Sequence, residues 1–174
     1  IRVSVGEKFP VVVRLGMVDE REGGITLEDS VAYAAELEKA SVDCFDVSVG
    51  ISVKQKYDNY VSPLKKEPAA IYLPYAEAIK KAVKVPVITA GRIHDPALAG
   101  NIVASGKADM VALARQLLCD PEWPKKVQEG RLKDILACSS CNTWCGGRVD
   151  LLYQDYKDTA VGCSMKRKSE AHSS

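Results

Sequence analysis

The sequence predicts an α/β fold in which short buried strands alternate with helices. Two observations support this. Several short apolar runs are rich in β-branched residues and lack polar alternation, as is typical of parallel strands. Each run is followed by residues with helical spacing or helix-capping chemistry. The resulting order fits either an open doubly wound sheet or half of a (β/α)8 barrel of ~250 residues, and periodicity alone does not choose between them.

The first half of the pattern begins with a strand at 9–14, where Phe-Pro-Val-Val-Val-Arg is a short apolar run expected to be buried. Thr26 followed by Asp29 forms an approximate capping box, so we expect a helix from Thr26 to Ala40. A second strand is predicted at 44–50. The loop predicted to follow it, at 51–70, is long enough to suggest a functional role.

The second half repeats the pattern. We expect a short helix at 75–83, a strand at 85–92 and a further strand at 109–115. Between these strands, Asp95 is a favourable N-cap because proline follows it at the first helical position, and the helix should stop at Gly106. A last helix is predicted at 121–130, with its terminal glycine as the stop signal.

Composition restricts the partners of the chain. The 24 Lys and Arg residues nearly balance the 23 Asp and Glu residues, so a net charge of +1 predicts neither a nucleic-acid nor an anionic-membrane partner. No apolar run approaches the ~20 residues that cross a bilayer, and a cytoplasmic location is expected. The chain begins with Ile1 inside what looks like the end of a helix, so we interpret it as a fragment. Homo-oligomerisation stays open.

Arginine residues recur at predicted strand ends. Arg92 and Arg115 end the third and fourth strands, and Arg14 ends the first. The carboxyl ends of barrel strands face the active site, and the last two β/α loops commonly bind phosphate. The planar guanidinium suits that task, and Gly91 would let backbone amides approach the same anion. We therefore predict an anion site, although each arginine could instead be a solvated strand end or form a local ion pair.

Cysteines crowd the last quarter of the chain, at Cys138, Cys141, Cys145 and Cys163. Without a secretory signal, metal ligation is favoured over disulfides. Four thiolates suit a [4Fe–4S] cluster or a structural zinc ion, and these spacings do not separate the two. Cys44 and Cys119 lie in apolar contexts and are expected to be plain core thiols.

These residues resemble a known family. The segment 85–96, Val-Pro-Val-Ile-Thr-Ala-Gly-Arg-Ile-His-Asp-Pro, resembles the seventh-strand segment of the Old Yellow Enzyme family, and 105–124 resembles its eighth strand and following helix. The run 129–135, followed by Cys138-x2-Cys141-Asn-x2-Cys145, resembles the branch that contains 2,4-dienoyl-CoA reductase, trimethylamine dehydrogenase and bile-acid-type enoate reductases. The likeness covers about residues 1–147.

The resemblance implies the C-terminal half of an FMN-binding (β/α)8 TIM barrel over 1–135 and then an iron–sulfur segment over 136–165. From their polar composition, residues 166–174 are expected to be a disordered tail. It implies that Arg14 lies near the flavin ring and ribityl chain, and that the phosphate is held by Gly91, Arg92, Ala114 and Arg115. The cysteines that it implies as [4Fe–4S] ligands are Cys138, Cys141, Cys145 and Cys163.

The implied activity is reduction of an activated C=C bond in a small enoate or enoyl-CoA-like substrate. Electrons would come from NAD(P)H through the cluster, with an FAD in later domains of the full-length relatives. Three features depart from the family pattern. Ala114 replaces a usual glycine, Cys163 follows after a longer interval than usual, and no histidine acid follows Gly50. The alternatives are a phosphate-metabolite-binding α/β protein with structural zinc, or a non-catalytic fragment.

Overall fold

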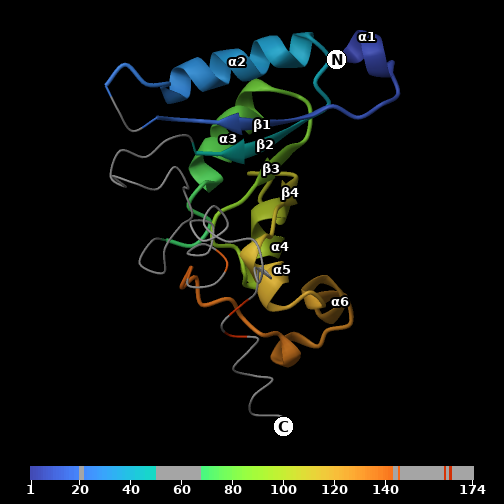
Figure 1. The fold of residues 1–174 in the computed structure, drawn as a ribbon, viewed down its shortest axis with the longest axis vertical. Coiled ribbons are helices and arrows are strands. Elements are labelled where there is room, and N and C mark those ends of the chain that lie inside the picture. Colours follow the sequence, from blue (N-terminus) through green and yellow to red (C-terminus); the bar gives the residue numbers. More distant parts are fainter. Residues whose placement is uncertain (20–21, 50–67, 143–144, 146–162, 164, 166–174) are drawn as a thin grey trace, which may run out of the picture.

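The computed structural model describes residues 1–19, 22–49, 68–142, 145, 163 and 165 (Figure 1). Its strands form one parallel sheet in the order β1-β2-β3-β4. The strands are β1 (Val12–Gly16), β2 (Cys44–Ser48), β3 (Val87–Thr89) and β4 (Met110–Val111). Each strand pairs with its neighbour in sequence, as barrel strands do, whereas a doubly wound sheet reverses its order at a switch point.

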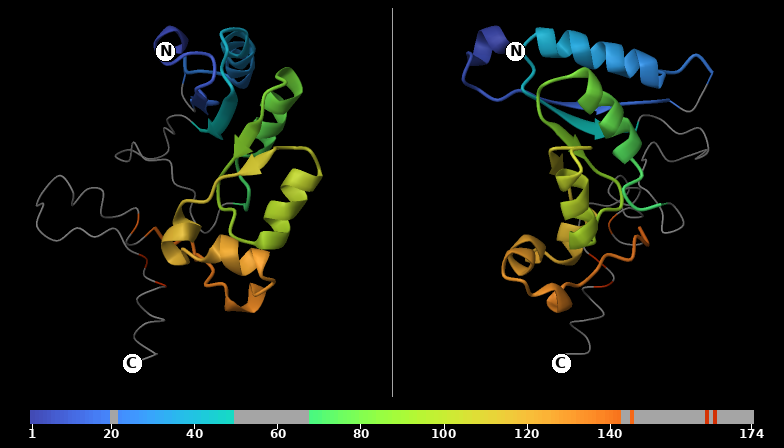
Figure 2. Two further views of the ribbon diagram at one scale, coloured as in Figure 1. Left: turned by 90° about the vertical axis from the view of Figure 1, so that its right-hand side faces the viewer. Right: turned by 180° about the vertical axis from the view of Figure 1, so that it is seen from behind.

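Helices cover one face of this sheet. The helices are α1 (Arg2–Val5), α2 (Leu27–Lys39), α3 (Leu73–Ala82), α4 (Pro96–Ala104), α5 (Arg115–Cys119) and α6 (Trp123–Gln128), followed by the 3-10 turn η1 (Leu132–Asp134). Figure 2 shows α2, α3 and α4 along the same side of the strands. Phe45, Val47 and Val87 are fully buried and share one core cluster with residues of these helices. The core therefore lies between the sheet and the helices.

The helix starts predicted at Thr26 and Asp95 and the stops predicted at Gly106 and Gly130 are confirmed, whereas α3 begins two residues earlier and α6 two residues later than predicted. The Thr26 hydroxyl accepts a hydrogen bond from the Asp29 amide at 3.2 Å, and the Asp29 carboxylate accepts one from the Thr26 amide at 3.0 Å. The Asp95 carboxylate likewise accepts from the amide of Ala97 at 3.0 Å. Gly106 and Gly130 follow the ends of α4 and α6 with φ of +69° and +71°, a region that favours glycine.

The first strand was predicted wrongly in two respects. β1 begins at Val12, so Arg14 lies inside the strand and does not end it. The strand is also only partly buried: Val12 is 54% exposed, and Phe9, just before the strand, is 58% exposed. Two physical reasons apply. Pro10 has no amide to donate to a ladder, and β1 is the outer strand of the described sheet, paired on one side only.

The third and fourth strands are shorter than predicted. β3 ends at Thr89, and the chain then turns through Gly91 and Arg92 with φ of +96° and +55°, outside the extended region. β4 ends at Val111, and Arg115 begins the helix α5, which was not predicted. Residues 111–118 are largely apolar, and such a run does not reveal whether it is a strand or a buried helix.

Several predicted features lie outside the described residues. They include residues 51–67 of the loop predicted at 51–70, and the polar tail at 166–174. Within the described part of the chain, no helix is both long enough and apolar enough to cross a membrane.

Candidate functional site

A single cavity of about 230 Å³ brings together the residues predicted to bind a cofactor. Arg14, Gly91, Arg92, Ala114 and Arg115 all line it. The cavity lies where the chain leaves β3 and β4 at their carboxyl ends. The sequence prediction that these residues meet at one site is therefore matched by the geometry. Tyr72, His94, Gln116, Cys138 and Ser140 also line this cavity and were not assigned to it from the sequence.

Gly91 makes a close approach of the backbone possible. Its φ is +96°, and a Cβ added there would lie 2.8 Å from Cγ2 of Ile71 and 2.9 Å from Cδ2 of Tyr72. The carbonyl of Gly91 also accepts a hydrogen bond from the amide of Ile71 at 3.2 Å. A side chain would both strain this turn and fill the space beside it. Glycine therefore leaves the cavity wall open to a ligand at this point.

Two arginines place positive charge at the cavity. Arg92 follows the turn after β3, and Arg115 is the first residue of α5, after β4. Arg92 donates from Nε to the hydroxyl of Ser140 at 3.4 Å, and Arg115 donates from Nη1 to Oδ1 of Asn142. Each guanidinium is a planar group with five N–H donors. The pair is suited to bidentate phosphate binding.

Arg14 reaches the cavity from a different direction. It forms an ion pair with Asp46 at 2.5 Å and donates to the hydroxyl of Ser48 at 3.1 Å, both on the neighbouring strand β2. The local ion pair considered from the sequence is therefore present. The Arg14 side chain nevertheless stays 61% exposed and lines the cavity. In the described part of the chain, Oδ1 of Asp46 is buried without a hydrogen-bond partner, which leaves an acceptor beside Arg14.

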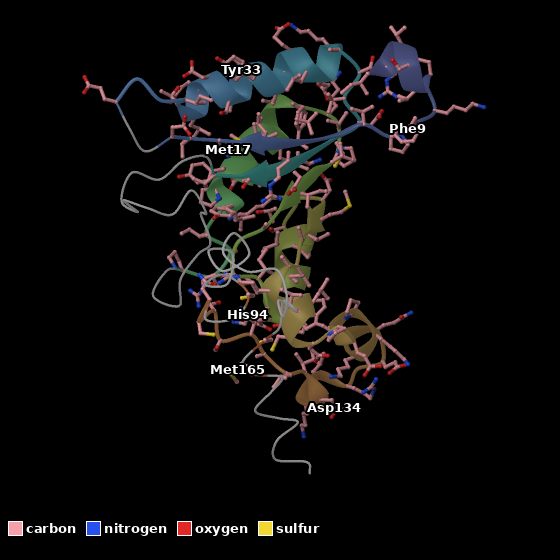
Figure 3. All side chains as sticks on the ribbon, in the orientation of Figure 1. Phe9, Met17, Tyr33, His94, Asp134 and Met165 are labelled. Carbon is pink, nitrogen blue, oxygen red and sulfur yellow. The ribbon has the colours of Figure 1, made fainter. Side chains whose placement is uncertain are left out.

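His94 lies in the loop between β3 and α4 and is part of the cavity wall. Its backbone carbonyl accepts a hydrogen bond from the indole Nε1 of buried Trp123 at 3.0 Å, which fixes the turn to α6. Figure 3 labels His94 among the residues below the sheet. Burial lowers the pKa of its imidazole, and the positive charge of Arg92 lowers it further. The imidazole is therefore neutral near pH 7 and leaves the positive charge to the arginines.

The described start of the cysteine segment, residues 136–142, lies against the same cavity. Cys138 lines it, and the Sγ atom of Cys138 accepts a hydrogen bond from the amide of Ser140 at 3.4 Å. Ser140 and Asn142 both have φ of +54°, a left-handed conformation that is uncommon outside glycine. The backbone is therefore wound tightly between Cys138 and Cys141. Amide hydrogen bonds to sulfur are a known feature of iron–sulfur sites.

Cys119, Cys145 and Cys163 interact electrostatically with Cys138 or with one another. Cys119 is 1% exposed and Cys163 is 8% exposed, as a core position requires. Burial raises the pKa of the Cys119 thiol to about 12, and a hydrogen bond with Cys163 raises it too. Burial also raises the pKa of Cys145, against the lowering effect of Arg115. No three His, Cys, Asp or Glu side chains among the described residues are arranged to hold a metal ion, so the four-cysteine ligand set remains a prediction.

The fold and the cavity together define a class of protein: a partial parallel barrel with an arginine-lined cavity at the carboxyl ends of its last two strands. The particular family follows from comparison. The chain belongs to the NADH:flavin oxidoreductase / NADH oxidase family, whose profile matches residues 1–134.

Relatives agree with this assignment. The chain is 45% identical over 151 residues to an NADH oxidase of Thermoanaerobacter brockii, covering 86% of this chain and 23% of that protein. It is 36% identical over 165 residues to a cinnamate reductase of Clostridium sporogenes, covering 86% of this chain and 24% of the relative. The structure of a 2-naphthoyl-CoA reductase with 2-naphthoyl-CoA superposes with a TM-score of 0.81 at 34% identity, covering 94% of this chain and 24% of that one.

Two conclusions follow from these comparisons. The α/β fold predicted from the sequence is confirmed as part of a barrel of the Old Yellow Enzyme type. The chain also spans only about a quarter of the length of these relatives. Family membership is therefore established, whereas the activity, substrate and electron donor of the whole protein are matters for proposal.

Proposed function

We propose that residues 1–135 form the phosphate side of an FMN site and residues 136–165 bind a [4Fe–4S] cluster, in a cytoplasmic reductase of activated C=C bonds. The proposal rests above all on one observation: the arginines, Gly91 and Cys138 line the same cavity. The relatives named as reductases of cinnamate and of 2-naphthoyl-CoA support a small enoate or CoA-thioester substrate. The matched family supports NADH or a related nicotinamide as electron source.

The cavity fits the phosphate end of FMN. Gly91 offers an open wall, and Arg92 and Arg115 offer cationic N–H donors from adjacent loops. Ala114 also lines the cavity, so the methyl group at this position leaves room there. Arg14 lines the same cavity with a largely exposed side chain and can donate to polar groups along the ribityl chain. When bound, FMN supplies the hydride chemistry, and these residues supply binding and orientation.

The cysteine segment fits a thiolate-ligated cluster by its chemistry. Cys138 already receives an amide hydrogen bond at its sulfur, and Cys145 and Cys163 are at least half-buried, which shields a cluster from water. The histamine dehydrogenase from Rhizobium sp. 4-9 and the dimethylamine dehydrogenase from a Hyphomicrobium species also match this chain. Cys138 and the arginines share one cavity, so a cluster and a flavin would lie close together. Short separation is what electron transfer between them requires.

The test is to purify the complete gene product that contains these residues under anaerobic conditions. We expect a visible spectrum with flavin and iron–sulfur absorption, about one FMN per chain released on denaturation, and about four iron and four sulfide per chain. Turnover is then measured with NADH or NADPH and a cinnamate-type acid or its CoA thioester. Stoichiometric zinc without iron or sulfide would contradict the cluster assignment, and a colourless protein would contradict the flavin assignment as well.

A further inference from the structure

The short helix α5 connects the two halves of the proposed site. Its first residue, Arg115, lines the cavity, and its second, Gln116, also lines it but is only 2% exposed. A buried amide side chain must have its donors and acceptor satisfied, or it destabilises the fold. The partners of Gln116 are therefore informative about its role.

Both ends of the Gln116 amide bind the backbone of the cysteine segment. Its Nε2 donates to the carbonyl of Leu136 at 3.0 Å, and its Oε1 accepts from the amide of Cys138 at 2.9 Å. A carbonyl and an amide two residues apart are the groups that an extended segment offers to a neighbouring strand. The side chain of Gln116 thus forms the two hydrogen bonds that a neighbouring strand would form with residues 136–138. One of these bonds is to the backbone of Cys138, a predicted cluster ligand.

The residue that caps the C-terminus of α5 completes this contact. Asp120, 4% exposed, accepts from the amide of Leu136 at 2.9 Å and from Nζ of Lys126 at 2.8 Å. Asp120 therefore fixes the segment before the cysteines, whereas Gln116 contacts the backbone of Cys138 itself. Figure 2 shows the chain after η1 passing close to α5.

We propose that Gln116 is a positioning residue that holds Cys138 in place as a cluster ligand, so that α5 contacts the FMN phosphate through Arg115 and the cluster loop through Gln116. This inference rests on the proposed function. Partners that orient a metal ligand typically change metal affinity by about 10–100-fold when they are removed. Gln116 does not touch the metal, so its effect should appear in cluster retention and electronic properties before flavin binding changes.

The test compares Gln116→Met, which keeps the length but can neither donate nor accept as an amide does, with Gln128→Met, an exposed glutamine at the end of α6. Both are made in the complete gene product. The readouts are the rate of iron loss to a chelator, the EPR spectrum of the reduced cluster and its midpoint potential. For Gln116→Met we expect roughly 10-fold or faster iron loss and an altered EPR signal, with FMN retained. The Gln128→Met protein should match the wild type.

Gln116→Glu separates the two bonds and covers the case in which Gln116→Met fails to fold. A carboxylate still accepts from the Cys138 amide but cannot donate to Leu136, so its iron loss should fall between those of the wild type and Gln116→Met. If Gln116→Met retains wild-type iron release and EPR, or if Gln116→Glu loses iron as fast as Gln116→Met, the inference is overturned. A wild-type protein without iron and sulfide would instead overturn the proposed function, and the inference with it.

Discussion

Arg115 donates a hydrogen bond to the side chain of Asn142, so a guanidinium at the predicted phosphate site is bonded directly to the cysteine segment. Asn142 follows Cys141 in the sequence. Arg92 makes a similar connection to Ser140, which lies between Cys138 and Cys141. The two arginines therefore contact the cysteine segment from both strand ends. An anion at the arginines and a metal at the cysteines would each stabilise the geometry that the other requires.

Arg115→Ala should weaken FMN binding. Removing a charge-assisted hydrogen bond to phosphate is expected to cost about 1.5–3 kcal/mol of binding free energy. The measurement is FMN affinity by fluorescence titration after the flavin has been removed from the complete gene product. Lys125→Ala is the matched control because it removes one exposed positive charge from α6, away from the cavity. Equal FMN affinity in the two variants would show that Arg115 does not bind the phosphate.

Gly91→Ala should lower both flavin retention and thermal stability. An alanine at φ of +96° is strained, and its Cβ would lie 2.8 Å from Ile71. The left-handed conformation alone costs roughly 1–2 kcal/mol for a non-glycine residue. Gly100→Ala provides the control, because Gly100 lies within α4 with nothing within 4 Å of an added Cβ. We expect the control to be neutral or slightly stabilising. Thermal unfolding with and without added FMN measures both effects.

Local signals in the sequence predicted much of the fold. The helix-capping signals are local, because all the residues that form them lie within a few positions in the sequence. They predicted the helix starts at Thr26 with Asp29, and at Asp95 with Pro96, correctly. The strand ends were harder to predict. β3 ends before a turn in which Arg92 has a positive φ, and the only sequence signal for this turn is the preceding residue, Gly91. The helix α5 was not predicted because it has only five residues. A segment of this length is too short for its hydrophobic periodicity to distinguish a helix from a strand.

The cavity was only partly predictable for a related reason. Arginines at strand ends stand out because parallel strands bring their carboxyl ends to one edge. Gln116 does not stand out, because its partners Leu136 and Cys138 lie about 20 residues later and bind it through their backbones. Every non-proline residue has a backbone amide and carbonyl, so the amino-acid types at 136 and 138 do not indicate that these residues bind Gln116. The same applies to Asn142, whose contact with Arg115 depends on how the cysteine loop is wound.

Cys141→Ser should abolish cluster binding. Cys141 lies in the middle of the closely spaced triplet, and a serine hydroxyl is a poor substitute for a thiolate on iron. Iron and acid-labile sulfide are measured in protein that has been purified anaerobically. Cys44→Ala is the control, since Cys44 is buried in β2 and belongs to the core rather than to the cysteine segment. The assignment fails if Cys141→Ser keeps its iron and sulfide, or if Cys44→Ala loses them to the same extent.

The last prediction is that residues 1–174, expressed by themselves, will not catalyse enoate reduction. The described sheet has four strands, and its outer strands β1 and β4 expose apolar side chains, with Val12 at 54% and Met110 at 42%. Such edges favour self-association or a partly molten state. Two of the cavity arginines are suited to a phosphate, and Arg14 is the described residue that we propose lies near a flavin. Without ring contacts from further strands, both flavin affinity and the orientation needed for hydride transfer are lost.

The test supplies the purified chain with FMN, a reductant and an α,β-unsaturated acid under anaerobic conditions, and follows substrate loss. The complete gene product serves as the positive control. Comparable turnover by the two proteins would show that the active site lies wholly within these residues, and the placement of the chain in the barrel would be wrong.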